Sequence, residues 1–425
     1  MQRLKISENK RYLIYADGTP FFYLGDTAWE LFHRLDREEA DYYLQTRADQ
    51  GYTVIQAAAL AEFGGLTEPN PYGDLALHHS DPTRPNDAYF QHIDWIINRA
   101  EALGLYVALL PTWGDKWNKA WGEGPEIFTP ENARVYGEFL GKRYKDKPIL
   151  WVLGGDRAIE NETHLKIYEA MADGVTAGDG GANIRTFHPK GGESSSLHLH
   201  DNPRLDFNML QSGHGARNIP NYAMIAADYE RSPVRPCLDA EPNYEEHPIN
   251  WKPENGYFNE YDVRKSAYQA LFAGAFGLTY GCQCVWQFYA AKRQPVAFPR
   301  LEWREALHLP GANQMRYARR LMESRPFLTR VPDQSLLSAN YDDPAAHQTA
   351  TRDKSGDYGF VYAPLGLPVQ VDLAKICKAR VRVSWFNPRT GETTEAGTVK
   401  NAGSREFLPP TSGQAQDWVL ILDAE

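Results

Sequence analysis

Short apolar segments alternate with helical patterns over most of the chain, and this alternation constrains the fold more than any other feature of the sequence. Eight segments are short, almost continuously hydrophobic and bounded by glycine, proline or polar residues. They cover residues 21–26, 52–60, 106–111, 149–155, 184–189, 207–213, 234–241 and 278–288. Continuous hydrophobicity is typical of parallel strands that are covered on both faces. Repetition on this scale predicts a (β/α)8 TIM barrel rather than a doubly wound sheet.

Helical patterns fill most of the intervals between these strands. They cover residues 38–50, 86–104, 130–144, 162–174, 219–231 and 260–277. Pro130 is placed where a helix should begin, a position that tolerates proline because no intrahelical donor is lost there. Residues 191–206 show no helical pattern, so we expect a loop between the fifth and sixth strands.

The texture of the sequence changes after about residue 328. The segments 334–341, 347–353, 358–365, 368–373, 379–388 and 417–423 are short and rich in β-forming residues, with turn signals at 354–357 and 387–391. This pattern predicts a small antiparallel β-sandwich. We therefore expect a catalytic barrel over residues 1–327 and a C-terminal domain over residues 328–425, which we expect to brace the barrel.

Charge and hydropathy exclude several classes of function. The formal net charge is −10 and no dense run of lysine or arginine occurs, so we expect no nucleic-acid partner. Residues 1–18 lack the apolar core of a signal peptide, and no stretch approaches about 18 apolar residues. We expect no membrane association and a cytoplasmic location, with a secreted protein whose signal peptide has been removed as the alternative. Nothing in the composition indicates an oligomeric state.

The four cysteines predict no metal centre. Cys237, Cys282, Cys284 and Cys377 show no CxxC spacing, and reduced thiols are the simpler interpretation. We expect no cofactor.

Functional residues of such a barrel lie at the carboxyl ends of its strands, where the βα-loops converge. The polar and aromatic residues near these ends are Asp26, Trp29, Trp113, Asp115, Trp117, Asp156, Arg157, His188, Gln211, His214, Glu241, Tyr244, Gln283, Trp286 and Gln287. Carboxylates, amides and aromatic rings suit a neutral polyol, because rings pack on sugar C–H surfaces while the polar groups bind hydroxyls. No phosphate-binding glycine motif is present.

Asp156 and Glu241 are the candidate catalytic pair. Glycosidic bond cleavage needs one carboxyl group to protonate the leaving oxygen and another to attack or to activate water. These two residues follow the fourth and seventh strands, which face each other across a barrel mouth. Asp156 could instead be a helix N-cap, and Glu241 could pair with Arg235. We expect Asp26, Trp29, Trp113, His188, Gln211, His214, Tyr244 and Trp286 to bind substrate.

The histidines leave a second interpretation open, a metal-dependent hydrolase or isomerase. His198 and His200 form an HxH pair, and His188 and His214 end neighbouring strands. However, the HxH pair lies in a serine-rich loop rather than on an early strand, so we expect no metal ligands. Ser212 lacks the GxSxG elbow of a serine nucleophile.

With these strand ends assembled, the sequence resembles the apiosidase-like glycoside hydrolases, glycoside hydrolase family 140. The segments that carry the resemblance are FFYLGDTAWELF, WVLGGD, the His188-Pro189 pair, QSGH and LDAEPNYE, and the ending resembles the small β-domain that follows this barrel. The resemblance spans nearly the whole chain. It implies hydrolysis of β-linked apiose, a branched pentose of pectin side chains and flavonoid glycosides.

The resemblance also implies a retaining double displacement, with Asp156 as acid/base and Glu241 as nucleophile. The sequence departs from the wider barrel glycosidases at one point, because the fourth strand usually ends in Glu after Asn and here ends in Asp after Gly. The acid is therefore about one methylene shorter, which bears on the carboxyl separation and the stereochemistry. A non-catalytic carbohydrate-binding barrel remains a further alternative.

Overall fold

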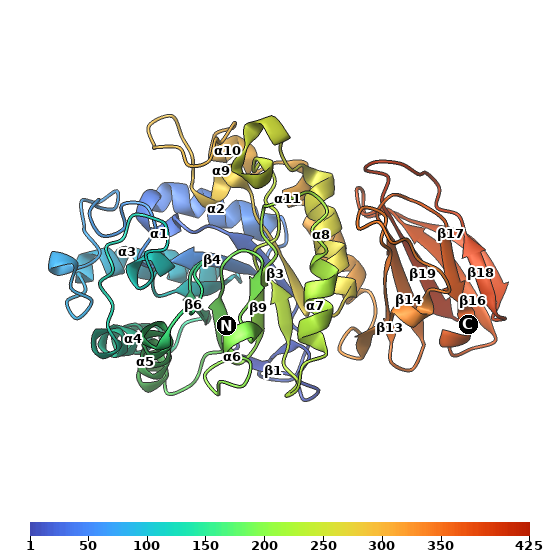
Figure 1. The fold of residues 1–425 in the computed structure, drawn as a ribbon, viewed down its shortest axis with the longest axis horizontal. Coiled ribbons are helices and arrows are strands. Elements are labelled where there is room, and N and C mark those ends of the chain that lie inside the picture. The colour runs from blue at the N-terminus through green and yellow to red at the C-terminus, as the bar shows by residue number, and fades with distance from the viewer.

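The computed structural model describes residues 1–425 and confirms the predicted TIM barrel (Figure 1). Its eight parallel strands are β3 (Tyr23–Thr27), β4 (Val54–Ala58), β5 (Tyr106–Leu110), β6 (Ile149–Gly154), β7 (Arg185–His188), β9 (Asn208–Gln211), β10 (Cys237–Asp239) and β11 (Gly277–Tyr280). Six of them form one curled sheet in the order β11-β3-β4-β5-β6-β7, and β10 pairs with β9. Thr186 in β7 donates to the Phe207 carbonyl (2.8 Å), and the Phe276 N–H donates to the Cys237 carbonyl (3.1 Å). These bonds join the two sheets on both sides.

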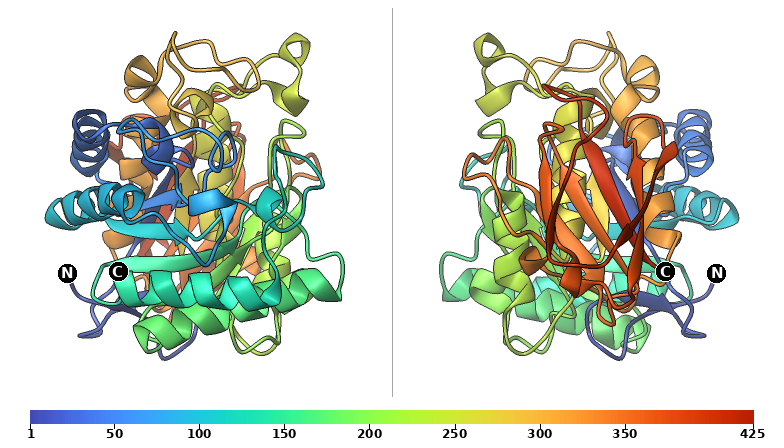
Figure 2. Two further views of the ribbon diagram at one scale, coloured as in Figure 1. Left: turned by 90° about the vertical axis from the view of Figure 1, so that its left-hand side faces the viewer. Right: turned by 90° about the vertical axis from the view of Figure 1, so that its right-hand side faces the viewer.

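Helices cover the outside of the barrel (Figure 2). The long ones are α2 (Arg37–Asp49), α3 (Asp87–Ala102), α4 (Pro130–Tyr144), α5 (Glu162–Asp179), α7 (Asn221–Tyr229), α8 (Glu260–Phe272) and α11 (Pro310–Glu323). Pro130 is the first residue of α4, and Thr129 caps that helix by accepting from the backbone N–H of Asn132. The segment 191–206, predicted as a loop, holds the short strand β8 (Glu193–Ser194) and one helical turn, α6 (Ser196–Leu199).

Several short elements complete the barrel. An N-terminal hairpin joins β1 (Leu4–Ile6) to β2 (Leu13–Tyr15), and the remaining helical turns are α1 (Leu31–Arg34), α9 (Gln283–Trp286), α10 (Trp303–Ala306), η1 (His78–Ser80), η2 (Gly114–Lys116), η3 (Ile249–Trp251) and η4 (Pro253–Asn255).

The prediction of a single strand over 278–288 is wrong in its second half. The strand ends at Tyr280, and Gln283 and Trp286 lie on the turn α9. Both sides of the segment are buried, so its hydrophobicity could not distinguish a strand from a strand followed by a buried helical turn.

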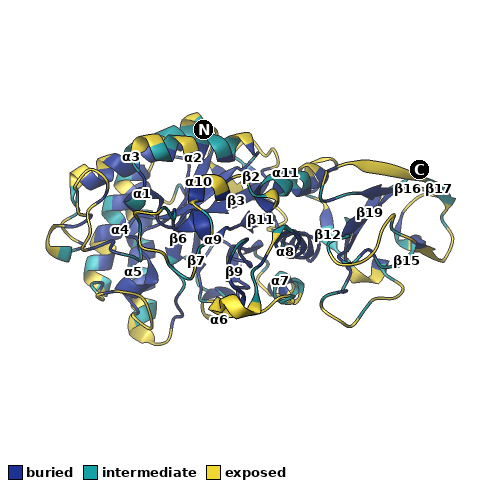
Figure 3. Cartoon of the chain, turned by 90° about the horizontal axis from the view of Figure 1, so that it is seen from above, coloured by how far each residue is buried: buried dark blue, intermediate teal, exposed yellow.

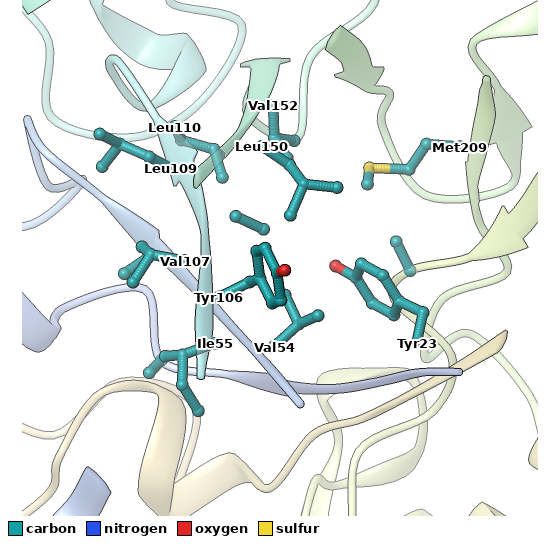
Figure 4. Packing of buried hydrophobic residues seen from close by; sticks show 14 of the residues in the cluster. Tyr23, Val54, Ile55, Tyr106, Val107, Leu109, Leu110, Leu150, Val152 and Met209 are labelled. Carbon is teal, nitrogen blue, oxygen red and sulfur yellow. The ribbon is translucent and has the colours of Figure 1, made fainter. Parts of the chain in front are cut away.

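Aliphatic and aromatic side chains fill the barrel interior and the space beneath the helices (Figure 4). The residues labelled there come from several strands of the barrel, for example Val54 and Ile55 on β4 and Leu150 and Val152 on β6. This packed interior makes the strand ends rigid supports for the residues that follow them.

The C-terminal domain is an antiparallel sandwich, as predicted. Six strands pair in the order β12 (Arg330–Pro332), β13 (Thr349–Asp353), β14 (Tyr358–Ala363), β19 (Trp418–Ala424), β16 (Arg380–Phe386) and β17 (Thr393–Lys400). The second sheet has β15 (Val369–Asp372) and β18 (Ser404–Phe407), with η5 (Gln334–Leu336) and η6 (Leu373–Lys375) nearby. Figure 3 shows β17 as the exposed edge, whereas the central strands are buried.

The central strand β14 of the larger C-terminal sheet is buried on both faces, because the face away from the sandwich core packs on α8. Tyr268 stacks on Tyr362 (centroids 5.1 Å apart) and Phe272 stacks on Phe360 (5.9 Å). Beside them the buried guanidinium of Arg264 donates to the carboxylate of Asp417 (2.8 Å). This contact fixes the second domain against the barrel.

No helix in the structure is both long enough and apolar enough to span a membrane.

Candidate active site

A cavity of about 600 Å³ opens among the loops that follow the barrel strands. It brings together many of the residues that the strand ends predicted: Trp29, Trp113, Asp156, Gln211, His214, Glu241, Tyr244 and Trp286. Other residues of its wall come from loops, namely Glu62, Phe63, Trp121, Gly122, Lys190, Gly191, His247, Trp251, Val296 and Ala297.

The expectation that Asp26 lines this cavity is wrong. Its carboxylate is fully buried and accepts hydrogen bonds from the Tyr43 hydroxyl (2.5 Å) and from Nε of Arg47 (2.7 Å). Both partners lie on α2, so Asp26 ties β3 to the helix that follows it. The sequence places a carboxylate at this strand end but does not determine whether its side chain faces the cavity or the surrounding helices.

Asp156 is presented by an unusual backbone at the end of β6. Gly154, Gly155 and Asp156 have φ of 95°, 103° and 56° in turn. A Cβ at Gly155 would lie 2.8 Å from the backbone nitrogen of Gly114, so only glycine fits there. Aspartate tolerates positive φ better than most residues. The Gly-Gly-Asp sequence thereby turns this carboxyl group into the cavity.

The side chain of Asp156 is held through one oxygen. Trp121 Nε1 and Arg157 Nη1 both donate to Oδ2, at 3.1 and 3.2 Å, whereas Oδ1 makes no hydrogen bond within the protein. Burial raises the pKa of Asp156 to about 6, the negative charge of Glu241 adds to the rise, and the Arg157 guanidinium opposes it. Since both donors occupy Oδ2, the acidic proton belongs on Oδ1.

Glu241 follows β10 and has different neighbours. His214 Nε2 lies 3.1 Å from Oε1 in hydrogen-bond geometry, and His188 Nε2 lies 3.0 Å from Oε2, outside that geometry. Burial alone would raise the pKa of Glu241, but the two imidazoles lower it to about 2. Glu241 is therefore ionised at neutral pH.

His188 contacts both catalytic candidates, through the backbone of Asp156 and the carboxylate of Glu241. We expected His188 to bind substrate, but its side chain is fully buried and does not line the cavity. The backbone N–H of Asp156 donates to His188 Nδ1 (3.2 Å), while Nε2 faces Glu241. Trp29 packs edge-on against the imidazole, with centroids 5.3 Å apart. One ring thus links the end of β6 to the end of β10.

Aromatic side chains form much of the cavity wall. Trp29 Nε1 donates to the Tyr244 hydroxyl (3.2 Å), and the Tyr244 ring packs against His214. Two buried polar atoms of the wall, Trp113 Nε1 and Gln211 Oε1, have no hydrogen-bond partner. An unpaired buried donor or acceptor is costly, so these atoms are suited to bind ligand hydroxyls.

The four histidines of the metal interpretation do not form one site. His188 and His214 contact Glu241, His200 hydrogen-bonds with Asn208, and His198 is exposed on α6. No group of three or more His, Cys, Asp or Glu side chains is arranged to hold a metal ion.

Sequence reasoning missed Glu62, Trp121, His247 and Trp251 as residues of the cavity wall. Glu62 follows β4, so the strand-end rule applied to that strand could have found it. Trp121 lies in the glycine-rich loop after β5 and is 45% exposed. Its place in the cavity wall depends on the course of that loop, which the sequence does not give. His247 and Trp251 lie farther along the loop after β10, where no strand-end rule reaches.

Comparison with protein families matches residues 7–329 to the catalytic domain of the apiosidase-like proteins. The chain belongs to the apiosidase-like family. Residues 331–423 of this apiosidase-like protein match a second family, whose description refers to the collagen-binding domain of a collagenase. No curated protein matches the sequence.

Solved structures agree with this assignment. A protein described as a glycoside hydrolase is 33% identical, with a TM-score of 0.92 over 100% of this chain and 97% of its own. A family 5 glycoside hydrolase from Bacteroides vulgatus ATCC 8482 is 31% identical, with a TM-score of 0.92 over 100% of this chain and 93% of its own. A Streptomyces cattleya enzyme, GH5_18 in complex with GlcNAc, shares only the fold, at 13% identity and a TM-score of 0.52 over 72% of this chain and 81% of its own. The apiosidase-like protein is a glycoside hydrolase, and its substrate is a carbohydrate.

Proposed function

We propose that this enzyme removes a β-linked apiose from a glycoside or a pectin side chain by a retaining double displacement. Asp156 is the acid/base and Glu241 is the nucleophile. The observation that carries the proposal is the contrast between these two carboxyl groups in one cavity. Burial raises the pKa of Asp156 to about 6, whereas two imidazoles lower that of Glu241 to about 2. An acid that holds its proton beside an ionised carboxylate is the pairing that glycoside cleavage requires.

In the first step, a Glu241 carboxylate oxygen attacks the anomeric carbon as the bond to the leaving oxygen breaks. The proton on Oδ1 of Asp156 passes to that oxygen, so the leaving group departs as a neutral alcohol. The sugar is then esterified to Glu241, and Asp156 is a carboxylate. Its Oδ2 remains held by Trp121 and Arg157, which stabilise the new negative charge.

In the second step, the Asp156 carboxylate removes a proton from water, and the resulting oxygen attacks the anomeric carbon. The ester bond to Glu241 breaks, and the product keeps the configuration of the substrate. The hydrogen bond from His214 to Oε1 stabilises Glu241 as the departing carboxylate. Both residues thereby return to their starting protonation states.

Two observations support a small sugar as the bound group. The unpaired atoms of Trp113 and Gln211 offer one donor and one acceptor for hydroxyls. Trp29, Trp113, Tyr244 and Trp286 give the cavity aromatic surface for C–H groups. Apiose as the particular sugar rests on the family to which the catalytic domain belongs.

The test is hydrolysis of a panel of aryl glycosides that includes β-apiosides, with and without a chelator. We expect the apiosides to be the best substrates. We expect the chelator to change kcat/KM by less than about twofold, because the strand-end histidines contact Glu241 instead of forming a metal site. Preference for another sugar would overturn the apiose assignment. Loss of activity in chelator, restored by zinc or manganese, would overturn the mechanism.

A further inference from the structure

The corner of the cavity beside Asp156 holds side chains to which the proposed chemistry assigns no contact with the substrate. Glu62 follows β4, Trp121 follows β5, and Arg157 comes directly after Asp156. Since Asp156 protonates the leaving oxygen under the proposed function, on which this inference rests, this corner lies on the leaving-group side of the scissile bond.

Trp121 is fixed at its edge and on one face. Its Nε1 donates to Oδ2 of Asp156 (3.1 Å), and the Arg157 guanidinium lies 4.1 Å from the indole centroid. Arg157 Nη2 also donates to the Trp121 carbonyl (2.6 Å). Trp121 is nevertheless 45% exposed and lines the cavity, which leaves the second face of its ring available to a ligand.

Glu62 points into the same corner without a hydrogen-bond partner. Its side chain is 13% exposed, and Oε1 lies 3.6 Å from Arg157 Nη2, beyond hydrogen-bond distance. Burial raises the pKa of Glu62 to about 8, Arg157 opposes the rise, and the charges of Asp156 and Asp115 add to it. The carboxyl group is therefore mostly protonated at neutral pH and can both donate and accept.

A buried ion pair holds the two loops that carry Glu62 and Trp121. Lys116 Nζ lies 2.8 Å from Oδ2 of Asp115 and also donates to the Glu62 carbonyl (3.1 Å). Asp115 Oδ2 in turn accepts from the Gly124 N–H (2.7 Å). The corner is thus a built site with fixed walls, which is what a binding site requires.

We propose that Trp121 and Glu62 bind the leaving group, and that this leaving group is a sugar ring rather than a planar aromatic aglycone. The open indole face packs on the C–H surface of the ring, and the Glu62 carboxyl binds its hydroxyls. An aryl leaving group would use the indole but would leave Glu62 desolvated and unpaired, which costs binding energy.

The experiment compares two substrates that share one glycone, a disaccharide and the matching p-nitrophenyl glycoside. The glycone is whichever sugar the wild-type enzyme hydrolyses, so an error in the apiose assignment does not affect the result. The readout is the ratio of kcat/KM for the disaccharide to kcat/KM for the aryl glycoside. A loop that is merely disturbed lowers both values and leaves the ratio unchanged.

Glu62→Leu should lower this ratio by about 10- to 100-fold, as expected for lost hydrogen bonds in a desolvated site. Glu62→Gln should keep most of the wild-type ratio at pH 7, because the amide group also donates and accepts hydrogen bonds. Trp121→Phe and Trp121→Ala both lose the donor to Asp156, but only the alanine variant loses the ring, so only it should lower the ratio strongly. The matched control is Glu123→Gln, an exposed carboxylate that accepts from the Gly64 N–H and does not line the cavity.

An unchanged ratio in Glu62→Leu, whether both kcat/KM values fall equally or neither falls, would overturn the proposal if thermal unfolding is also unchanged. Asp156→Ala on the same pair tests the proposed acid separately. If Asp156 is not the acid, its variant will show no dependence on leaving-group pKa, whatever the Glu62 variants do. If the variants of Glu62 unfold, the comparison of Trp121→Phe with Trp121→Ala still decides whether this corner recognises the leaving group.

Discussion

The ends of β6 and β10 carry the same functional group in opposite states. Asp156 leaves β6 through two glycines with positive φ, and its Oδ2 is bound by an indole and a guanidinium. Glu241 leaves β10 on ordinary backbone and lies between two imidazoles. Burial is common to both, so it cannot separate them. The neighbours decide which carboxyl keeps its proton, and the same barrel thereby supplies an acid and a carboxylate.

Removing the β10 carboxylate should have the largest effect. Glu241→Ala should lower kcat on every glycoside by about 10⁴-fold or more, because no covalent intermediate can form without a nucleophile. Glu241→Gln, which keeps the shape of the side chain, should be equally inactive, and steady-state kinetics on aryl glycosides measures both. Residual activity within about 100-fold of wild type would rule out Glu241 as the nucleophile.

Removing the β6 carboxyl should be selective. Asp156→Ala should lose about 10²- to 10⁴-fold on substrates with basic leaving groups and far less on activated aryl glycosides, since a good leaving group needs little protonation. Azide should partly restore turnover by attacking the glycosyl-enzyme, giving a glycosyl azide of retained configuration. A loss that is independent of leaving-group pKa would contradict the acid role.

The pH profile of kcat/KM should report the pKa values of both carboxyl groups. Activity needs ionised Glu241 and protonated Asp156, so kcat/KM should fall as the pH rises through about 6 and stay high well below neutrality. His214→Ala removes the donor to Oε1, so the pKa of Glu241 should rise and the acidic limb should move to higher pH. We expect a loss of about 10- to 100-fold at the optimum.

The control for that variant is His198→Ala, an exposed histidine outside the cavity, which should leave the profile unchanged. An acidic limb that does not move in His214→Ala would show that the imidazole does not set the pKa of Glu241.

Stability should respond to the two carboxyls with opposite signs. The folded pKa of Asp156 lies above its unfolded value, so the free energy of unfolding falls as the pH rises through about 6. Asp156→Asn carries no charge and should be more stable than wild type at pH 8, by about 1–3 kcal/mol, with little difference at pH 4.

Glu241 has the reverse linkage. Its folded pKa is lowered, so it contributes stability above its unfolded pKa that is lost as the pH falls toward 2. Glu241→Gln should therefore be less stable than wild type at neutral pH, by about 1–3 kcal/mol. Denaturant unfolding at the two pH values measures both variants, and shifts of the same sign at pH 8 would contradict the opposed environments.

The sequence predicts the barrel and the two carboxylates for related reasons. Eight buried parallel strands leave a strong hydrophobic signal, and the strand-end rule then locates Asp156 and Glu241 without knowledge of their contacts. The rule fails where side-chain direction matters, because Asp26 also ends a strand yet faces α2. It cannot place loops either, which is why Trp121 and Trp251 emerge only from the structure.

Opposite protonation is the part that sequence could least predict. Arg157 is adjacent to Asp156 in the chain, but its contacts with Trp121 and Glu62 depend on three separate loops meeting. Likewise His188 and His214 come from two other strand ends, and only the closed barrel brings both to Glu241.

The configuration of the first product shows directly whether Glu241 acts as a nucleophile or as a base. Hydrolysis in buffer containing methanol, followed by proton NMR in the first minutes, gives the free sugar and a methyl glycoside whose configuration is fixed once formed. We expect a methyl glycoside with the same anomeric configuration as the substrate, because the sugar passes through an ester to Glu241. An inverted product would contradict this expectation, since Glu241 would then activate water as a base instead of attacking the sugar.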